Sequence, residues 1–434
     1  MSKMDLISLF LFKEELLMDI LEDLKWRGLV KDLTNEENIK ELLKEPITLY
    51  CGFDPTGDSL HVGHLVPLLL LRRFQLAGHH PIAVAGGATA MIGDPSGRSS
   101  ERNMQTVEEI QDNLESIKKQ LSVFLDFGGN NPAQLLNNYD WLSKINIIDY
   151  LRTYGKYFTV NYMLAKDVVA SRLETGISFT EFSYMTLQSV DFLTLKRDYN
   201  CSLQIGGSDQ WGNLTAGCDL IRKVLGNESK VEAMTLPLIT KSDGTKFGKS
   251  AGNAVWLDPK RTSPYEFYQF WINVSDDEAA NYLKVFTFLD KEEILEIMKE
   301  HEKAPHLRLA QKLLASEMTK IVHGEMALKD AKMITEVLFT GDIKDLTHEQ
   351  VEMCFAGLES VEVDDSINIV DALIAVNAAK SKREAREFIS GNSISINGEK
   401  VTDVEFMVDK EVAFGNKVTV IRRGKKKYFL LRHR

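Results

Sequence analysis

The sequence predicts an α/β protein in which a doubly wound parallel sheet is followed by a small helical domain and a small α+β domain. Strand-like and helix-like segments alternate over residues 47–225. The pattern becomes helical from Ser263 to about Thr340, and a strand, an Asn-Gly turn and a strand follow near the C-terminus. A chain of 434 residues has room for two or three such domains.

Strands of the parallel sheet are expected at short runs rich in β-branched and apolar residues, namely 47–53, 81–87, 135–139, 202–206 and 234–239. Helices are expected between them, at residues 62–77, 105–125, 160–174, 180–197 and 209–225. Ligands of such sheets bind at the carboxyl ends of the strands. Gly86-Gly87 and Gly206-Gly207 stand at two of those ends, where a ligand can approach the backbone.

Changes in the pattern of apolar and charged residues along the chain suggest its domain boundaries. We expect an N-terminal helical segment over 1–46, the sheet domain over 47–262, a helical domain over 263–345, an acidic irregular linker over 346–365 and a final domain over 366–434. In the final domain, residues 367–376 and 382–390 predict helices. Residues 393–401, 417–422 and 428–431 predict a small sheet.

Composition excludes several classes of protein. A hydrophobic content of 44% with 26% charged residues is typical of a folded globular chain. The four cysteines are scattered without a Cys-x-x-Cys pair, so we expect no disulfide framework, no metal site and a reducing cytoplasm. No apolar run approaches the ~20 residues of a membrane span. The short run 6–12 lacks the cleavage site of a signal peptide.

Charge is distributed unevenly along the chain. Residues 380–434 hold 14 Lys and Arg against 7 Asp and Glu, a net charge of +7, so the net charge of −11 leaves −18 on residues 1–379. A basic tail on an acidic body indicates a local nucleic-acid surface. The run Arg422-Arg-Gly-Lys-Lys-Lys-Tyr428 favours this interpretation over an ordinary solvated face.

Two short motifs indicate phosphate chemistry. His61-Val-Gly-His64 follows a strand and a turn at the start of a helix, whose free N–H groups and dipole suit a phosphate. By itself this motif fits two half-buried histidines equally well. Far along the chain, Lys246-Phe-Gly-Lys249-Ser250 lies in a polar Gly-containing loop that could bring positive charge to the same phosphates. Together they predict attack on the α-phosphate of ATP with loss of pyrophosphate.

These motifs resemble the two signatures of the class I aminoacyl-tRNA synthetases, in the form found in bacterial tyrosyl-tRNA synthetases. Further segments match that family in order. They are Leu49-Tyr-Cys-Gly-Phe-Asp-Pro-Thr56, Ile92-Gly-Asp-Pro-Ser-Gly97, Thr175-Gly-Ile-Ser-Phe-Thr-Glu-Phe-Ser-Tyr-Met185, Gln204-Ile-Gly-Gly-Ser-Asp-Gln-Trp-Gly-Asn213 and Ser263-Pro-Tyr-Glu-Phe-Tyr-Gln-Phe-Trp271. The resemblance implies a Rossmann-like catalytic domain, a helical anticodon-side domain and an RNA-binding domain like that of a small-subunit ribosomal protein. Pro67 departs from relatives that carry Thr, and should remove a hydroxyl near the ribose.

The resemblance also implies the ATP site. Thr56 and His61 would contact the pyrophosphate, Cys51 and His64 the ribose, and Lys246 and Lys249 the pyrophosphate as their loop closes. Arg98 and Arg102 would form a second clamp, and Gly52, Asp54 and Gly63 would line the nucleotide site. Adenylation needs alignment and charge neutralisation more than a protein nucleophile. Mg²⁺ is expected to arrive with ATP.

A substrate pocket is indicated by three polar residues on one predicted helix. Tyr184, Gln188 and Asp191 are spaced i, i+4, i+7, so they share a face that is costly to bury without a polar ligand. A purely structural hydrogen-bond network is the alternative. By resemblance, Tyr184, Gln188 and Asp94 would bind the α-ammonium of tyrosine, and Tyr50 and Asp191 its phenol. Gln204 and Gln210 would add polar contacts.

The resemblance implies a homodimer that binds the tRNA for tyrosine. Candidate RNA contacts are the basic residues of the tail, namely Lys382, Arg383, Arg386, Arg422, Arg423, Lys425, Lys426 and Lys427.

Three other functions fit parts of the sequence. A tryptophan-specific relative shares the scaffold, but Tyr50 with Asp191 favours a phenol. A small nucleotidyltransferase shares His-x-Gly-His but does not explain the helical and RNA-binding domains. A non-enzymatic RNA-binding regulator would not need His61, His64 and both signature lysines.

Overall fold

The computed structural model describes residues 19–97, 105–240, 247–250, 253–340, 343–364, 366–424 and 427–434. Its internal contacts divide the chain into two compact units, residues 1–258 with 274–314 and residues 259–273 with 315–434. Within the described ranges, no helix is both long and apolar enough to cross a membrane. The apolar run 6–12 lies outside these ranges.

The first unit is built on a five-stranded sheet whose strands all run parallel, in the order β3-β2-β1-β4-β5. The strands are β1 Thr48–Phe53, β2 His80–Ala85, β3 Gln134–Asn137, β4 Cys201–Gly207 and β5 Glu232–Leu236. All five predicted strands are therefore present, although β5 ends three residues early. The central position of β1 places Tyr50 beside Ile82 of β2 and Gln204 of β4.

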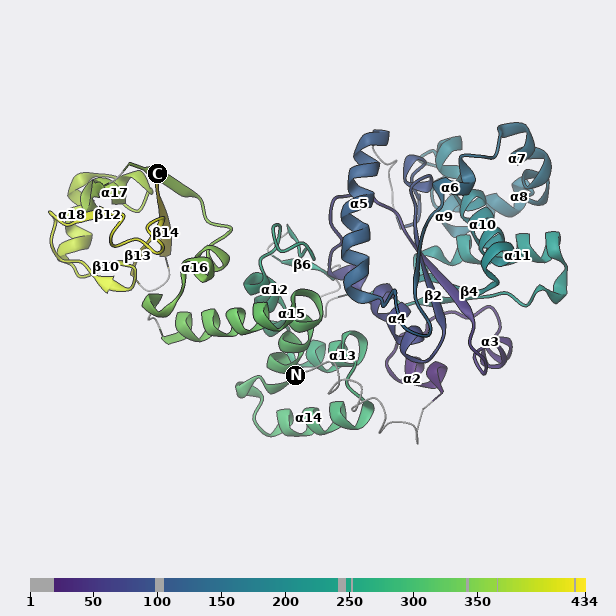
Figure 1. The fold of residues 1–434 in the computed structure, drawn as a ribbon, viewed down its shortest axis with the longest axis horizontal. Helices are drawn as coiled ribbons and strands as arrows, with labels where there is room; N and C mark the ends of the chain where they lie inside the picture. The colour runs from purple at the N-terminus through teal and green to yellow at the C-terminus, as the bar shows by residue number, and fades with distance from the viewer. Residues whose placement is uncertain are drawn as a thin grey trace. The chain divides into compact units, whose positions relative to one another are not determined.

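Helices cover both faces of this sheet (Figure 1). On one face lie α4 Leu65–Leu76, which follows a 3-10 turn at Val62–His64, and α5 Val107–Phe124. On the other lie α10 Phe179–Tyr199 and α11 Trp211–Leu225. The core on that side joins Val190 and Phe192 of α10 and Leu214 of α11 to Ile82 of the sheet. Pro67 sits in the first turn of α4, where the missing N–H has no helical acceptor.

The single helix predicted over 160–174 is wrong. The chain forms two short helices, α8 Val160–Leu164 and α9 Asp167–Ala170, because Lys166 between them is extended with ψ at 133°. Tertiary contacts fix this break. Lys166 Nζ donates to Thr215 Oγ1 of α11 at 3.1 Å, and the Tyr162 hydroxyl donates to Asp219 at 2.8 Å.

Two short helices, α2 Ile20–Trp26 and α3 Glu36–Leu42, lie within the helical segment expected over 1–46. Other short elements were not predicted because each is too brief to show a period, namely the 3-10 turn η2 Thr89–Met91, α6 Tyr139–Leu142 and α7 Ile147–Thr153. The helices α2, α3 and α7 begin at Asp19, Asn35 and Asn146, whose side chains accept from backbone N–H groups of the first turn.

The predicted change to a helical pattern at Ser263 is confirmed. The helices are α12 Pro264–Ile272, α13 Asp276–Phe286, α14 Lys291–Lys303 and α15 Leu309–Thr340, the last kinked at Gly324 with φ at 86°. Ser263, Ser275 and Asp290 cap the first three, each with a Glu three residues later that reaches back to the cap. The first unit includes α13 and α14, and the second includes α12.

The second unit contains a sheet in the order β11-β10-β13-β14-β8, formed by β8 Ser360–Val363, β10 Ile394–Ile396, β11 Glu399–Lys400, β13 Val418–Arg423 and β14 Lys427–His433. The expected hairpin is present, with Asn397 and Gly398 at positive φ in its turn. Helices α17 Ile369–Ala375 and α18 Lys382–Ser390 match the two predicted there.

The expectation that 346–365 is irregular is wrong. Residues 348–354 form α16, and β8 pairs in parallel with β14 inside the sheet. Val351 and Phe355 pack with Val418 and Leu430 in one core. The segment exposes Glu349, Glu359, Glu362 and Asp364, whereas Val351 and Phe355 face the core, so the acidic composition concealed an apolar face.

Candidate active site

The predicted substrate residues meet at the carboxyl ends of β1, β2 and β4. Tyr50, Cys51 and Gly52 belong to β1 and Gln204 to β4, while Tyr184, Gln188 and Asp191 project from α10. Figure 1 shows α10 packed along this sheet. The i, i+4, i+7 spacing thus brings one polar helix face to the end of the central strand, as the sequence predicted.

Asp191 is buried and accepts two hydrogen bonds. Asn138 Nδ2 lies 3.0 Å from one carboxylate oxygen and Trp141 Nε1 lies 2.7 Å from the other. Burial raises the pKa of Asp191 to about 7, although both hydrogen bonds act to lower it. Sequence reasoning missed Asn138 and Trp141. The available signal was the pair Asn137-Asn138 near the carboxyl end of the strand predicted over 135–139, with Trp141 just beyond it.

Three enclosed polar atoms have no hydrogen-bond partner within the described ranges. They are the Tyr50 hydroxyl, Gln188 Oε1 and Gln204 Oε1. Burial, with the Asp191 charge second, holds the pKa of Tyr50 well above its usual value, so this phenol is neutral. A buried polar group without a partner costs about 1–3 kcal/mol. Three such atoms on the adjacent strands β1 and β4 and on α10 are typical of a site that binds a polar ligand.

Asp54 is held close to the end of β2. It accepts from the Tyr184 hydroxyl and from Thr89 Oγ1, each at 2.8 Å. A Cβ on Gly86 would lie 1.9 Å from Asp54 Oδ1, so the glycine is required for this approach. The predicted ammonium ligand Tyr184 and the predicted ATP residue Asp54 therefore belong to one hydrogen-bonded group.

Asp94 forms a second acidic centre. Its carboxylate accepts from Gln210 Nε2 at 2.6 Å and from the backbone N–H of Ser96 at 3.0 Å. Asn213 Nδ2 donates to Gln210 Oε1 at 3.1 Å. The Asp94 charge contributes, after burial and Asp54, to raising the pKa of Tyr184, which places Asp94 near the same pocket. Asn213 was not predicted as part of the site.

The two histidines of the first signature cap the turn before α4. His61 Nδ1 accepts from Gly63 N at 3.0 Å, and His64 Nδ1 accepts from His61 N at 3.1 Å. Burial lowers the pKa of His61 and lowers the pKa of His64 to about 3. Both rings are therefore neutral near pH 7, and each carries its proton on Nε2 as a donor.

Gly63 also makes room for a neighbouring side chain of the same motif. A Cβ there would lie 2.7 Å from Cε1 of His61. The missing side chain therefore makes room for the His61 imidazole, which lies 4.0 Å from the His64 ring between centroids.

Cys51 and Thr56 differ in exposure. The Cys51 side chain is buried, which raises the pKa of its thiol to about 12 and keeps it neutral. Thr56 follows the strand in a turn, with its N–H bonded to the Asp54 carbonyl at 2.8 Å, and is exposed. The neutral thiol of Cys51 can act only as a weak donor or acceptor.

The second signature lies beside the first. The backbone N–H of Val62 donates to Val255 O at 3.0 Å, and the N–H of Val255 donates to Gly248 O at 2.9 Å. Phe247 packs between Tyr282 and Phe286 of α13, with ring centroids 5.1 and 5.2 Å away. The backbone of Lys249 lies in a two-residue strand paired with Ala254. Lys246, Arg98 and Arg102 lie outside the described residues.

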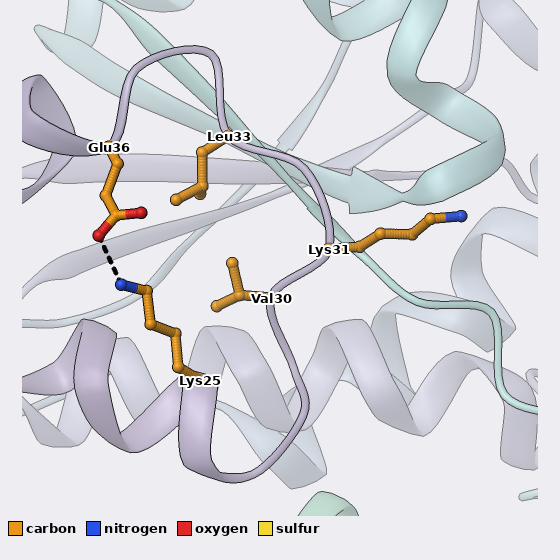
Figure 2. A pocket seen from close by; sticks show the side chains of 5 residues that line it. All are labelled: Lys25, Val30, Lys31, Leu33 and Glu36. Atoms are coloured by element: carbon orange, nitrogen blue, oxygen red, sulfur yellow. Dashed lines mark hydrogen bonds and ion pairs between the residues drawn. The ribbon is translucent and has the colours of Figure 1, made fainter.

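A separate pocket of about 400 Å³ lies in the N-terminal segment, lined by Lys25, Val30, Lys31, Leu33 and Glu36. Figure 2 shows the Lys25 ammonium turned toward Glu36, at 2.6 Å. None of the predicted substrate residues lines this pocket, and two of its three charges neutralise each other. It contributes nothing to the site at the strand ends.

The family models agree with this geometry. The model described as "tRNA synthetases class I (W and Y)" matches residues 42–340, and the model described as "Tyrosine--tRNA ligase SYY-like C-terminal domain" matches residues 350–431. A tyrosine–tRNA ligase of Bacillus cereus is 55% identical over 417 residues, covering 96% of this chain and 100% of the relative. One from Enterococcus faecalis is 55% identical over 415 residues, covering 95% and 99%.

The chain belongs to the class I tyrosine–tRNA ligase family.

A solved member of this tyrosine–tRNA ligase family has the same fold. It is a C-terminally truncated mitochondrial tyrosyl-tRNA synthetase of Aspergillus nidulans, 32% identical with a TM-score of 0.68, covering 76% of this chain and 96% of that one. Membership makes the chain an aminoacyl-tRNA synthetase whose activity is tyrosine–tRNA ligation. The tryptophan-specific, nucleotidyltransferase and non-enzymatic alternatives are thereby excluded.

The basic residues of the tail fall into two groups in this tyrosine–tRNA ligase. Arg383 and Arg386 are exposed on α18, and Lys382 pairs with Asp371 at 2.6 Å. In contrast, Arg423 donates to Ala378 O and lies over the rings of Phe388 and Phe429, 5.0 and 5.8 Å from their centroids. Its guanidinium is thus used inside the domain, which disfavours its predicted RNA contact.

Two other tail candidates, Arg422 and Lys427, are described in the same sheet as Arg423. Arg422 shares β13 with it and is half-buried, whereas Lys427 is exposed at the start of β14. Lys425 and Lys426 lie outside the described residues.

Proposed function

We propose that this tyrosine–tRNA ligase activates L-tyrosine in the pocket at the ends of β1 and β4. The tyrosine phenol lies between Tyr50 and Asp191, and its ammonium group lies near Tyr184, Gln188 and Asp94. The observation that carries this proposal is the set of unpartnered atoms, the Tyr50 hydroxyl, Gln188 Oε1 and Gln204 Oε1, around a buried carboxylate. A bound tyrosine supplies hydrogen-bond partners of the required polarity.

The Asp191 carboxylate supports recognition of a phenol because it can accept a hydrogen bond from the phenol hydroxyl. Asn138 and Trp141 hold both carboxylate oxygens in place, and the neutral Tyr50 hydroxyl can donate to the phenol oxygen. Phenylalanine would leave these groups unsatisfied in a desolvated pocket, which is unfavourable. Gln204 and Gln210 complete the polar lining.

ATP binds, we propose, at the start of α4. The Nε2–H groups of His61 and His64 can donate to the nucleotide, because their Nδ1 atoms already accept backbone N–H groups. His61 and Thr56 contact the pyrophosphate and His64 and Cys51 the ribose, with Gly52, Asp54 and Gly63 lining the site.

The reaction joins the tyrosine carboxylate to the α-phosphate and releases pyrophosphate. The nucleophile is already an anion, so the protein's contribution is alignment and charge neutralisation. Lys246 and Lys249 with Arg98 and Arg102 supply the cations. Mg²⁺ enters with ATP as part of the substrate; among the described residues, no group of three acidic, His or Cys side chains could hold a metal. Transfer to the terminal adenosine of the tRNA follows in the cytoplasm.

We further propose a homodimer that forms through α7, α8 and the start of α10. This part of the chain exposes Ile147 by 65%, Ile148 by 66%, Val160 by 62% and Phe179 by 78%. Scattered apolar side chains are ordinary, but such a concentration within 33 residues is typical of a protein interface.

Pyrophosphate–ATP exchange tests the proposal. The full chain should exchange pyrophosphate with tyrosine and exchange it far more slowly with phenylalanine or tryptophan. Lys249→Ala should slow adenylate formation in a single turnover while tyrosine binding is nearly unchanged, because the loop charge acts on the transition state. Exchange that is independent of tyrosine would refute the proposed activation step. A Lys249→Ala protein that loses tyrosine affinity but keeps its rate would refute the role of the loop.

A further inference from the structure

A continuous chain of hydrogen bonds connects the two ends of the substrate pocket. Thr89 Oγ1 donates to Asp54 Oδ1 at 2.8 Å, Asn138 Nδ2 donates to Thr89 Oγ1 at 2.9 Å, and the same amide donates to Asp191 Oδ2 at 3.0 Å. Thr89 and Asn138 are almost fully buried, with 2% and 1% of their surface exposed. The chain therefore runs through an interior from which water is excluded.

The direction of each bond in this chain is determined. Asn138 Oδ1 accepts from the backbone N–H of Ala88 at 2.8 Å, so its NH₂ group faces Thr89 and Asp191. Its two protons are then divided between those residues. Because Thr89 Oγ1 accepts one of them, its own single proton points to Asp54. No group in the chain can reverse its role without losing a partner.

The backbone is shaped to allow this arrangement. Thr89 begins the η2 turn directly after Gly86-Gly87-Ala88, and the N–H of Ala90 donates to Gly86 O at 2.8 Å. A Cβ on Gly86 would lie 2.4 Å from Thr89 Oγ1 and 1.9 Å from Asp54 Oδ1. The glycine thus leaves space that is filled by the hydroxyl and the carboxylate together.

We propose that Thr89 is a positioning residue that determines selectivity for the phenol of tyrosine by orienting Asn138 against Asp191. This inference rests on the proposed placement of the phenol beside Asp191. At its other end Thr89 supports Asp54, which orients Tyr184 near the ammonium group. Loss of the hydroxyl affects both ends, but only the Asn138 end distinguishes tyrosine from phenylalanine, because both amino acids carry the same ammonium group.

The test compares Thr89→Val, which keeps the shape and removes the hydroxyl, with Thr89→Ser, which keeps the hydroxyl. The measurement is kcat/KM for tyrosine and for phenylalanine in pyrophosphate exchange. Thr89→Val leaves an Asn138 proton and an Asp54 lone pair unsatisfied. We expect it to lower the value for tyrosine about 10- to 100-fold and the tyrosine/phenylalanine ratio about tenfold. Thr89→Ser should restore the ratio to within about threefold.

Thr235→Val is the matched control. Thr235 is also buried, and its hydroxyl donates to the carboxylate of Asp32 at 2.7 Å, but Asp32 belongs to the N-terminal segment. This variant should lose thermal stability to a similar extent and keep the wild-type ratio. An equal loss for both amino acids in Thr89→Val would overturn the proposal, and so would a ratio that Thr89→Ser does not restore.

The outcome for Thr89 can be separated from the outcome for the proposed function. If the wild-type chain shows no preference for tyrosine over phenylalanine, the proposed substrate placement fails. If the wild type is selective and Thr89→Val remains equally selective, only the role of Thr89 fails. Melting temperatures of all variants, measured in parallel, identify any loss of activity that comes from unfolding.

Discussion

At the scale of single residues, the site depends on polar groups whose charge state is controlled by burial. Burial keeps His61, His64 and Cys51 neutral, and it brings the pKa of Asp191 to about 7. Beside Asp191, the Tyr50 hydroxyl is also kept neutral by burial, and a neutral donor next to an ionisable acceptor suits the recognition of a phenol hydroxyl. Substrate recognition should therefore depend on whether the Asp191 carboxyl group is ionised.

Asp191→Asn should lower the tyrosine/phenylalanine ratio of kcat/KM by roughly 10- to 100-fold. An amide has one oxygen, whereas Asn138 and Trp141 both donate to this position, so one donor loses its acceptor. Asp219→Asn is the matched control, because Asp219 accepts from the Tyr162 hydroxyl at 2.8 Å outside the proposed pocket. An unchanged ratio in Asp191→Asn would remove this residue from the phenol site.

The same residue predicts a pH dependence. The raised pKa of Asp191, about 7, means that the carboxylate is lost as the pH falls through that value. Tyrosine affinity should therefore fall between pH 8 and pH 6, while phenylalanine affinity changes little. Equilibrium binding of tyrosine and phenylalanine across this pH range checks the prediction. The Asp191→Asn variant is the reference, because its tyrosine affinity should not change with pH. A tyrosine profile parallel to that of phenylalanine would contradict it.

At the scale of elements, short helices present the apolar surface proposed for dimer formation. Asn146 caps α7, and this fixes Ile147 and Ile148 in its first turn, where they are exposed. Behind them, Tyr150 and Tyr154 pack toward the core of the sheet. One face of α7 thus anchors the segment and the other is left apolar, which is the arrangement expected of a helix that meets a second chain.

Ile148→Asp should shift the protein from dimer to monomer, because a buried charge without a partner is strongly unfavourable in an apolar interface. Sedimentation velocity at several protein concentrations measures the change. Leu295→Asp is the control, since Leu295 is 52% exposed on α14, outside the proposed interface. The proposal would be wrong if the wild type sediments as a monomer or if both variants behave alike.

At the scale of the whole molecule, the excess of basic charge is confined to residues 380–434 of the second unit. Its arginines serve different purposes, because Arg383 is 90% exposed by its side chain whereas Arg423 is held by Ala378 O and two phenylalanine rings. Deletion of the tail from residue 362 would also remove β14 from its pairing with β8 and expose the core around Val351. Point substitutions therefore test RNA binding better than truncation.

Arg383→Ala with Arg386→Ala should weaken tRNA binding and reduce the slope of log affinity against log salt by about 2, as expected for two lost phosphate contacts. Tyrosine-dependent exchange should be unchanged. Lys40→Ala with Lys44→Ala is a control that removes the same charge from the N-terminal segment, at α3 and just beyond its end. Arg423→Ala should instead lower the melting temperature and leave the slope unchanged. Equal slopes for the first pair and the control would remove α18 from the RNA surface.

The sequence by itself determined the five strands, the helices flanking them and the face shared by Tyr184, Gln188 and Asp191. These follow from local periodicity, since alternation and helical spacing are properties of neighbouring residues. The Asn397-Gly398 hairpin is predictable for the same reason, because its turn needs two positive φ angles that these residues adopt easily. Within the proposed pocket, however, Asn138, Trp141 and Thr89 gave no periodic signal.

Only the tertiary structure decided which groups meet. Asn138 and Asp191 are 53 residues apart and Tyr184 and Asp54 are 130 apart, and no local pattern records such pairings. The break at Lys166 and the pairing of β8 with β14 have the same origin, because contacts distant in sequence override local preference. Charge states were also decided there. The pKa of His64 and Asp191 depends on burial, which exists only after the chain has folded.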